Sequence, residues 1–306
     1  MSTLIYFVTE DRYISPIPGN TYVENIFRED ELLGSALASL GYEHKRVSWR
    51  DSSIDWERAG WVLIRTTWDY FDHFEEFSHW LRQLPAKTCM NPKALLSWNT
   101  DKHYLLDLAQ KRIPIVPSTI ISRQHSVPLS VRASELGYSH IIVKPTIAGA
   151  ARLTYQLRDE QIGAFDRDFT KLNAKEDFIL QPFVSSVTSF GELSLMVMGG
   201  KCTHAVQKRV KVGDFRVQDD FGGTVHHFTL TSELIEFAEM VMGLIDPKPL
   251  YGRVDILRND ADKWMVSEVE LIEPELWFRT APEAVEHLAM AIHNHIQHYH
   301  ENHSNP

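Results

Sequence analysis

The chain has 306 residues, 43% of them hydrophobic, which is enough for about two domains with buried cores. Asp and Glu outnumber Lys and Arg by 41 to 31, and this net charge of -10 argues against electrostatic binding to nucleic acid or to an anionic membrane surface. No apolar run reaches the roughly 18 residues of a membrane span, no basic signal segment opens the chain, and the 2 cysteines fit a reduced compartment, so we expect a cytoplasmic protein.

The first 90 or so residues alternate strand and helix patterns. A short apolar run predicts a strand over 4–9, and further strands are predicted over 43–49 and 60–68. Helices are predicted over 29–41, from the helical spacing of its apolar residues, and over 71–85. This order is typical of a small parallel α/β layer, which binds ligands at the ends of its strands. The polar residues expected at those strand ends are Glu10, Asp11, Arg65, Thr66 and Asp69.

A second unit follows with a different pattern. "TDKHYLLDLAQKR" predicts a helix with Thr100 as its N-cap, and "HIIVKPT" predicts a strand that leads into the small-residue loop "TIAGAAR". Further along we expect a helix within 159–173, a strand over 178–183, a hairpin that turns at Gly199-Gly200, a polar loop, a helix over 232–245, a strand pair over 251–271 and a helix from about 282 to 300.

The strand pair carries three carboxylates. Glu268 and Glu270 lie at i and i+2 of one strand, so they face the same side, and Asp255 lies on the neighbouring strand. Two carboxylates about 4 Å apart repel by up to about 4 kcal/mol at an effective dielectric near 20. The pattern therefore predicts a solvent-facing acidic surface, a protonated carboxyl group or a bound cation. Carboxylate oxygens suit Mg²⁺, Ca²⁺ or Mn²⁺, and Mg²⁺ takes one or two of them beside water and phosphates.

Basic residues in this acidic chain point to a phosphate ligand. Lys102 lies at the start of a helix, and Lys144 ends a strand that is too apolar for an ordinary surface strand. The small residues after Lys144 let backbone N–H groups approach a phosphate. A further basic segment is "KRVKVGDFR". Together with the carboxylates, these features predict an ATP site, although the P-loop motif and the protein-kinase motifs HRD and DFG are absent from the sequence.

Six histidines fall within 287–303. A metal-binding tract is one interpretation. The apolar residues Val285, Leu288, Ile292, Ile296 and Tyr299 favour the other, a helix with one buried face and histidines on the rest of its surface.

From Trp98 to Trp277 the order of motifs resembles an ATP-grasp ligase of the glutathione-synthetase-like, RimK-like branch. The stretches that carry this resemblance are "WNTDKHYLLDL", "IIVKPTIAGAA", "FILQPF", "GELSL", "AVQKRVKVGDFRVQDDFGGT", "GRVDILR" and "SEVELIEP". A looser similarity extends to the O-ureido-serine cyclo-ligase type. The resemblance implies a mixed α/β architecture with an N-terminal parallel α/β layer (1–95), a central lid subdomain (96–184) and a C-terminal antiparallel-sheet subdomain that holds the metal site (185–306).

The resemblance also implies roles for individual residues. Asp255, Glu268 and Glu270 would hold Mg²⁺, with Mn²⁺ as an alternative, and Glu270 stands where the family usually has Asn. ATP would lie between the last two subdomains, with lysines and the small-residue loop on its phosphates, the strand over 178–183 on its adenine, and Glu192 near the ribose or the phosphates. The residues implied for ATP are Lys102, Lys144, Gly149, Gln181, Phe183 and Glu192.

The family reaction activates a carboxylate as an acyl phosphate, which an amine then attacks. Arg253 faces the same side of its strand as Asp255 and is expected to stabilise the oxyanion. Arg216 would clamp the acyl phosphate, and Lys208 lies in the same basic segment. We therefore expect Arg253, Arg216 and Lys208 to be the catalytic residues.

The expected partners are small-molecule carboxylate and amine substrates, which Arg65 and Asp69 are expected to bind. We expect no nucleic-acid partner and no membrane partner, and homo-oligomerisation is left open. A regulatory ATP-binding protein without ligase activity and a member that stops at phosphoryl transfer are the alternatives. The presence of the three carboxylates, both lysines and Arg253 favours the ligase, including an intramolecular one.

Overall fold

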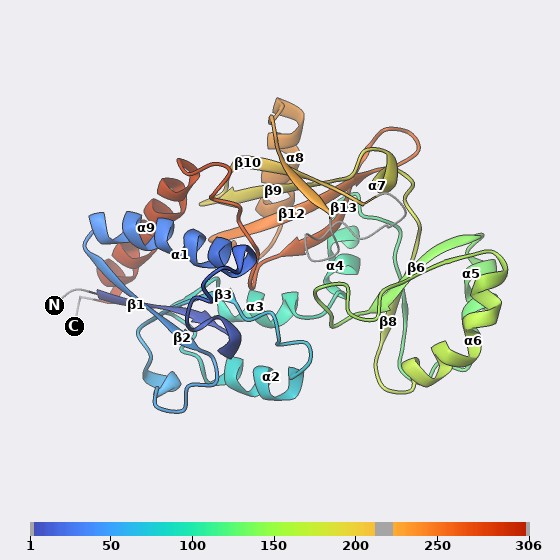
Figure 1. Cartoon of the computed structure of the whole chain (residues 1–306), viewed down its shortest axis with the longest axis horizontal. Coiled ribbons are helices and arrows are strands. Elements are labelled where there is room, and N and C mark those ends of the chain that lie inside the picture. The colour runs from blue at the N-terminus through green and yellow to red at the C-terminus, as the bar shows by residue number, and fades with distance from the viewer. Residues whose placement is uncertain (1–2, 212–222, 304–306) are drawn as a thin grey trace.

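A computed structural model describes residues 3–211 and 223–303 as a mixed α/β protein built on three sheets, which confirms the predicted mixed α/β architecture (Figure 1). One sheet lies in the N-terminal layer, one in the lid, and one in the C-terminal part. Each sheet falls within one of the three predicted segments, while the boundaries themselves stay a prediction.

The N-terminal sheet is parallel, with the strand order β2-β1-β3-β4. Its strands are β1 (Thr3–Thr9), β2 (Tyr42–Ser48), β3 (Trp61–Thr66) and β4 (Cys89–Met90). Every residue of β3 is buried, as expected for a parallel strand that is covered on both faces. Helix α1 (Thr21–Ser39) packs on one face, helix α2 (Phe74–Gln83) packs on the other, and the short helices η1 (Asp11–Tyr13) and η2 (Trp56–Arg58) lie in connections.

Helix α1 begins eight residues before the predicted start at 29. The reason is local, because Oδ1 of Asn20 accepts a hydrogen bond from the backbone N–H of Val23 at 3.2 Å and so caps the helix. Val23 and Ile26 extend the buried face that continues at Leu33 and Leu37. Polar residues between them hide this periodicity in the sequence.

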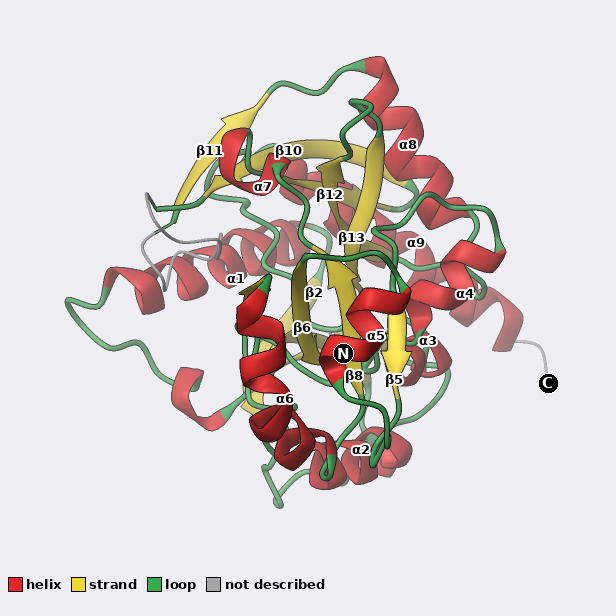
Figure 2. Ribbon diagram, turned by 90° about the vertical axis from the view of Figure 1, so that its right-hand side faces the viewer, coloured by secondary structure: helices red, strands yellow, loops and turns green. Residues whose placement is uncertain are grey.

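The lid sheet is antiparallel, with the order β5-β8-β6-β7, and helices α5 and α6 cover one of its faces (Figures 1 and 2). Its elements are β5 (Thr119–Ile121), α5 (Leu129–Glu135), β6 (His140–Pro145), β7 (Tyr155–Arg158), α6 (Glu160–Asn173) and β8 (Phe178–Pro182). Burial alternates along β6, where Ile141 and Val143 face the helices. The side chains of Ile142 and Lys144 therefore emerge on the opposite face of the sheet.

The C-terminal sheet is antiparallel, with the order β11-β10-β9-β12-β13. Its strands are β9 (Glu192–Met198), β10 (Lys201–Arg209), β11 (Thr224–Phe228), β12 (Tyr251–Arg258) and β13 (Trp264–Glu270). Gly199 and Gly200 form the predicted tight turn, with positive φ angles of 57° and 81° that favour glycine. The helices of this part are α7 (Ser186–Ser189), α8 (Ser232–Gly243) and α9 (Ala284–His303), and α9 packs against α1 as well as against this sheet.

Two helices connect the first sheet to the others, α3 (Lys93–Asn99) and α4 (Tyr104–Gln110). The prediction that Thr100 caps helix α4 is wrong. The Thr100 hydroxyl donates to the Ser97 carbonyl at 2.8 Å, and His103 occupies the N-cap position of α4. Helix α4 packs Leu105 and Leu108 into the core of the C-terminal sheet rather than into the lid. None of the helices in the described ranges combines the length and apolar character that crossing a membrane requires.

Asn91 ties the N-terminal layer to the C-terminal sheet. Its side chain is fully buried, and its Nδ2 donates to the carbonyls of Tyr251 and Leu271 at 2.8 Å each. Its Oδ1 accepts from the backbone N–H groups of Leu250 at 2.5 Å and Tyr251 at 3.2 Å. Four backbone groups thus depend on one side chain.

Asn91→Ala is expected to lower the free energy of unfolding by about 2–4 kcal/mol, because buried donors and acceptors lose their partners. Urea denaturation measures this change. Asn302→Ala, at the exposed end of α9, is the matched control and should change stability by less than about 0.5 kcal/mol. Equal effects of the two variants would show that Asn91 does not hold the layers together.

Candidate active site

A cavity of about 260 Å³ is lined by residues from both the lid and the C-terminal sheet. Strands β6 and β8 and the loop after β6 line it from the lid, and strands β9, β10, β12 and β13 line it from the other side. The predicted site residues that line it are Lys102, Lys144, Gly149, Gln181, Phe183, Glu192, Lys208, Arg253, Asp255, Glu268 and Glu270.

Strand register places the three carboxylates on one face, as the sequence pattern predicts. Asp255 of β12 lies opposite Glu268 of β13, and Arg253 lies opposite Glu270. A bulge follows Asp255 and shifts the pairing by one residue. The four side chains therefore form two neighbouring rows on the face of the sheet that lines the cavity.

Side chains from α3 and α4 fix the outer edge of β13 between its two carboxylates. Asn99 donates to the Val269 carbonyl at 2.8 Å and accepts from the Leu271 N–H at 2.7 Å. The hydroxyl of Tyr104 accepts from the Val269 N–H at 3.0 Å. Because β13 ends its sheet, these groups would otherwise lack backbone partners, and satisfying them holds the strand that carries Glu268.

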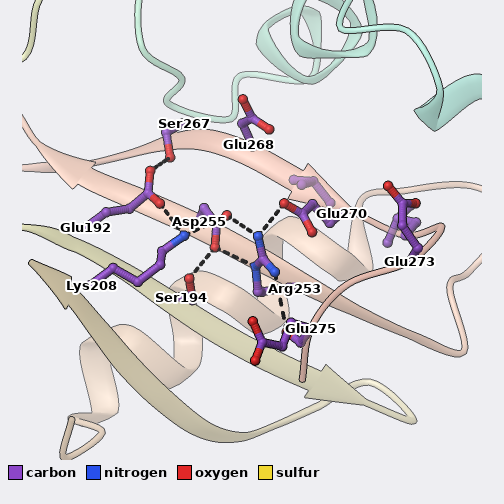
Figure 3. A network of polar contacts seen from close by, with 12 residues as sticks. Glu192, Ser194, Lys208, Arg253, Asp255, Ser267, Glu268, Glu270, Glu273 and Glu275 are labelled. Carbon is purple, nitrogen blue, oxygen red and sulfur yellow. Dashed lines mark hydrogen bonds and ion pairs between the residues drawn. The ribbon is translucent and has the colours of Figure 1, made fainter. Parts of the chain in front are cut away.

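Asp255 is the centre of a buried ion network (Figure 3). Arg253 binds both of its carboxylate oxygens, at 2.9 Å and 2.8 Å, while Lys208 lies at 3.3 Å and the Ser194 hydroxyl donates at 2.5 Å. Burial alone would raise the pKa of Asp255, but Arg253 and Lys208 hold it well below its usual range. Arg253 also pairs with Glu270.

Glu268 brings the two predicted phosphate-binding lysines together. The ammonium group of Lys144 lies 2.5 Å from one of its oxygens, and that of Lys102 lies 4.0 Å from the other. Although burial opposes ionisation, the two lysines lower the pKa of Glu268 to about 2. Lys102 also donates to the Ala148 carbonyl at 2.6 Å, so both lysines lie beside the loop that follows β6.

The three carboxylates do not surround one point. Within residues 3–211 and 223–303, no three His, Cys, Asp or Glu side chains are close enough to share a metal ion. Glu268 pairs with Lys144, whereas Asp255 and Glu270 both pair with Arg253. The donor chemistry nevertheless fits Mg²⁺, since burial and the negative charges of Asp255 and Glu268 raise the pKa of Glu270 to about 7 despite Arg253. This excess negative charge is what a divalent cation would neutralise, and the metal role stays a prediction.

One end of the cavity is apolar and suits a base. Its walls are Val116, Ile142, Phe183, Val184, Val187 and Leu257. Gln181 is buried there and donates through Nε2 to the Ser118 hydroxyl at 2.9 Å. The backbone N–H of Phe183 donates to the His140 carbonyl at 2.9 Å, so an adenine contact at this residue would use its carbonyl oxygen.

The small-residue loop has the backbone shape that the sequence suggested. Ala150 and Ala151 have positive φ angles of 47° and 56°, a region that favours glycine. At Gly149, a Cβ atom would lie only 2.7 Å from the Phe71 ring, so a larger residue there would force that ring to move. Tight backbone of this kind places N–H groups close to a ligand.

Lys208 and Glu192 are partners within the cavity rather than separate groups. They form an ion pair, and the Ser267 hydroxyl donates to Glu192 at 2.8 Å. Burial, together with Asp255, raises the pKa of Glu192. Arg216, the other cation of the predicted basic segment, lies outside the described residues.

The predicted substrate residues Arg65 and Asp69 do not line the cavity. The Arg65 guanidinium is buried and lies 2.8 Å from Asp30, whereas Asp69 accepts from the Trp49 indole at 2.9 Å and pairs with Arg50 at 2.5 Å. Both side chains are thus engaged within the N-terminal layer, and the structure does not bring them together. Their substrate role stays a prediction.

Several polar and aromatic residues that build or support the cavity were not predicted from the sequence. Tyr70, Asn99, Tyr104 and Glu273 line it, and Trp277 packs its ring 4.9 Å from the Arg253 guanidinium and 5.8 Å from the Lys208 ammonium. Asn99, Tyr104, Glu273 and Trp277 stand in or beside stretches that carry the resemblance, and Tyr70 directly follows the predicted substrate residue Asp69. The available signal was that "WDY", "WN" and "ELIEPELW" flank groups of expected function.

Comparison with known proteins places this fold and site in a family. Residues 105–260, just over half of the chain, match the family described as "Prokaryotic glutathione synthetase, ATP-grasp domain". The chain therefore belongs to the ATP-grasp ligases, and the prediction of an ATP-dependent ligase is confirmed. Residues 5–91 match "D-cycloserine synthetase DcsG, N-terminal domain".

Individual relatives agree with this assignment. The cycloserine biosynthesis protein DcsG of Streptomyces lavendulae is 28% identical over 260 residues, covering 79% of this chain and 85% of the relative. The crystal structure of D-cycloserine synthetase DcsG has a TM-score of 0.81 at 25% identity, covering 95% of this chain and 99% of that one. D-alanine–D-alanine ligase of Bacillus anthracis shares the fold, with a TM-score of 0.65 at 13% identity and 97% coverage of each chain.

A buried carboxylate beside Arg65 makes stability depend on pH. Glu29 accepts from the Leu276 N–H at 3.1 Å and lies 3.7 Å from Arg65. Burial, reinforced by Glu275, raises its pKa from 4.5 to about 7 although Arg65 opposes the shift. The folded state therefore binds more protons than the unfolded state between these pH values, and the contribution of Glu29 to stability falls as the pH rises from 4.5 towards 7.

Glu29→Gln removes this titration. Relative to the wild type, the variant should gain about 1–3 kcal/mol of unfolding free energy between pH 5 and pH 8. Urea denaturation at the two pH values measures the difference. Glu31→Gln, at an exposed position of the same helix, should show no such gain, and a flat difference for Glu29→Gln would contradict the raised pKa.

Proposed function

We infer that the chain is an ATP- and Mg²⁺-dependent carboxylate–amine ligase that acts on a small amino-acid-like substrate and releases ADP and phosphate. One observation carries the inference: Lys102 and Lys144 converge on Glu268 in the same cavity that holds the Arg253–Asp255 pair. Cations for phosphates and carboxylates for a metal ion thus face one space between the lid and the C-terminal sheet.

In this proposal the apolar end of the cavity holds adenine, with Gln181 and the Phe183 carbonyl as polar contacts. Lys102, Lys144 and the backbone of the loop over 148–151 bind the phosphates. Glu268 and Glu270 would hold Mg²⁺ or Mn²⁺, with Asp255 beside them. When bound, the metal ion neutralises phosphate charge and lowers the repulsion that an anionic carboxylate meets.

A carboxylate oxygen of the substrate attacks the γ-phosphorus of ATP, and the bond to the bridging oxygen breaks to release ADP. An amine then attacks the acyl carbon, loses a proton and displaces inorganic phosphate. Arg253, held by Asp255 on one side and by the Trp277 ring on another, would stabilise the negative charge that develops on the carbonyl oxygen. The protein mainly positions groups and balances charge, as phosphoryl transfer requires.

The similarity to relatives named for cycloserine biosynthesis supports a small substrate derived from an amino acid, because it covers most of both chains. It also supports a cyclising reaction in which the amine and the carboxylate belong to one molecule. The fold of D-alanine–D-alanine ligase agrees with ligation but adds nothing on the substrate of this chain.

Phosphate release tests the proposal. ATP, MgCl₂ and single or paired amino acids in both enantiomeric forms are supplied, and inorganic phosphate is measured. At least one combination should raise release above the rate with ATP alone. Glu268→Gln should lower that rate by at least about 100-fold, since it removes the negative charge of a proposed metal ligand, while the exposed Glu233→Gln should not. Nucleotide binding without release for any combination would favour a non-catalytic protein.

Lys144→Met tests the phosphate contacts separately. Loss of one cation should weaken binding of a fluorescent ATP analogue by about 10–100-fold, and should weaken adenosine binding by less than about twofold. Lys171→Met, at an exposed position on the lid helix α6, is the control and should leave both affinities unchanged. Equal losses for ATP and adenosine would show that Lys144 does not contact phosphate.

A further inference from the structure

The lining carboxylates of the cavity differ in their partners. Glu192 pairs with Lys208, Glu268 pairs with two lysines, and Asp255 and Glu270 share Arg253. Glu273 also lines the cavity, yet it forms no ion pair with any residue in the described ranges. In Figure 3 its carboxylate stands beside the network without a link to it.

The backbone that carries Glu273 is held from three sides. The Trp68 indole donates to the Glu273 carbonyl at 2.9 Å, which links the loop to the N-terminal layer. The Tyr251 hydroxyl donates to the Ile272 carbonyl at 3.3 Å, and Arg253 donates to the Glu275 carbonyl at 3.3 Å. The position of Glu273 is therefore defined by the fold although its charge has no partner.

The surroundings of Glu273 disfavour a lone negative charge. Burial and the nearby Glu270 raise the pKa of Glu273 to about 8, although the charges of Lys102 and Arg253, which form no ion pair with it, oppose the shift. Tyr70 also lines the cavity. Burial raises the pKa of the Tyr70 hydroxyl most, and the negative charge of Glu273 is the next largest cause. A cation with hydrogen-bond donors would relieve this charge and could donate to both side chains.

We propose that Glu273 binds the ammonium group of the substrate and that Glu273 thereby selects amino acids over their hydroxy-acid analogues. This rests on the proposed ligase function. Arg253 and Glu273 line the same cavity, so one end of it offers a guanidinium for an activated carboxylate and a carboxylate for an ammonium group. That combination suits a zwitterion, and the bound ammonium is a recognition group or the amine that later attacks.

A primary ammonium fits this position better than a metal ion. An ammonium group has three N–H donors and needs only one carboxylate and one or two neutral acceptors, which Glu273 and the Tyr70 hydroxyl supply. Mg²⁺ requires octahedral oxygen ligands at short distances, which one carboxylate and one phenolic hydroxyl do not supply. Glu273 is thus a binding residue separate from the metal set.

Calorimetry on the full chain saturated with ADP and MgCl₂ tests the proposal without turnover. The probes are the proteinogenic amino acids in both enantiomeric forms and, for each that binds, the hydroxy acid with OH in place of the amine. The wild type should bind at least one amino acid about 30-fold or more tightly than its hydroxy acid. Glu273→Gln should lower this ratio by about tenfold or more and leave ADP affinity within about twofold.

Two further variants complete the design. Glu273→Asp keeps the charge and should retain most of the preference for the amino acid, which separates loss of the carboxylate from a disturbed loop. Glu283→Gln, at an exposed position, should behave as the wild type. If Glu273→Gln does not fold, the Asp variant decides, because a wild-type ratio supports the proposal and a ratio near one overturns it.

The outcomes separate this inference from the proposed function. Binding of no amino acid, or an unchanged ratio in Glu273→Gln, overturns it. A rise of about tenfold or more in the Mg²⁺ concentration needed for ADP binding would make Glu273 a metal ligand and overturn it as well. If an amino acid binds through Glu273 but ATP yields no phosphate with any combination, the ligase proposal fails and the ammonium site stands.

Discussion

Pairing of buried opposite charges is the constraint on which this molecule depends. Among the described residues, five carboxylates and four cations line one cavity, and a buried charge without a partner costs several kcal/mol. The fold meets this cost by bringing β12, β13, β10 and the lid strand β6 to one place, so that cations from one element face carboxylates from another. A cavity arranged in this way is also prepared for a ligand with both signs of charge, because phosphates can exchange with carboxylates and a metal ion can exchange with lysines.

The rest of the architecture serves that arrangement. Asn91 fixes the N-terminal layer to the ends of β12 and β13, and Asn99 and Tyr104 fix β13 itself. Helix α9 then packs against both α1 and the C-terminal sheet. Helices α5 and α6 cover one face of the lid sheet, and the opposite face lies toward the cavity. Lys144 emerges from that opposite face and therefore reaches Glu268 of the C-terminal sheet.

Local patterns in the sequence predicted the parts that depend on neighbours along the chain. Period-two spacing placed Glu268 with Glu270, and the apolar strand before Lys144 marked that lysine as unusual; register then set Asp255 opposite Glu268. The same reasoning failed where the deciding partner is distant. Arg65 looked available at a strand end, but Asp30 of α1 binds it. Glu273 was not predicted, because what sets it apart is that its carboxylate forms no ion pair with any described residue. That property can be recognised only when the partners of all the other charged residues are known.

The covered edge of β13 has a consequence beyond the positioning of its carboxylates. An unpaired strand edge is a template on which another chain can add a strand, and such edges begin aggregation and domain swapping. Here Asn99 and Tyr104 occupy the hydrogen-bonding groups near one end, and the Val116 N–H donates to the Val266 carbonyl at 2.9 Å near the other. The strand that carries Glu268 and Glu270 is thereby closed to added strands along most of its length, which protects the cavity from strand exchange between molecules.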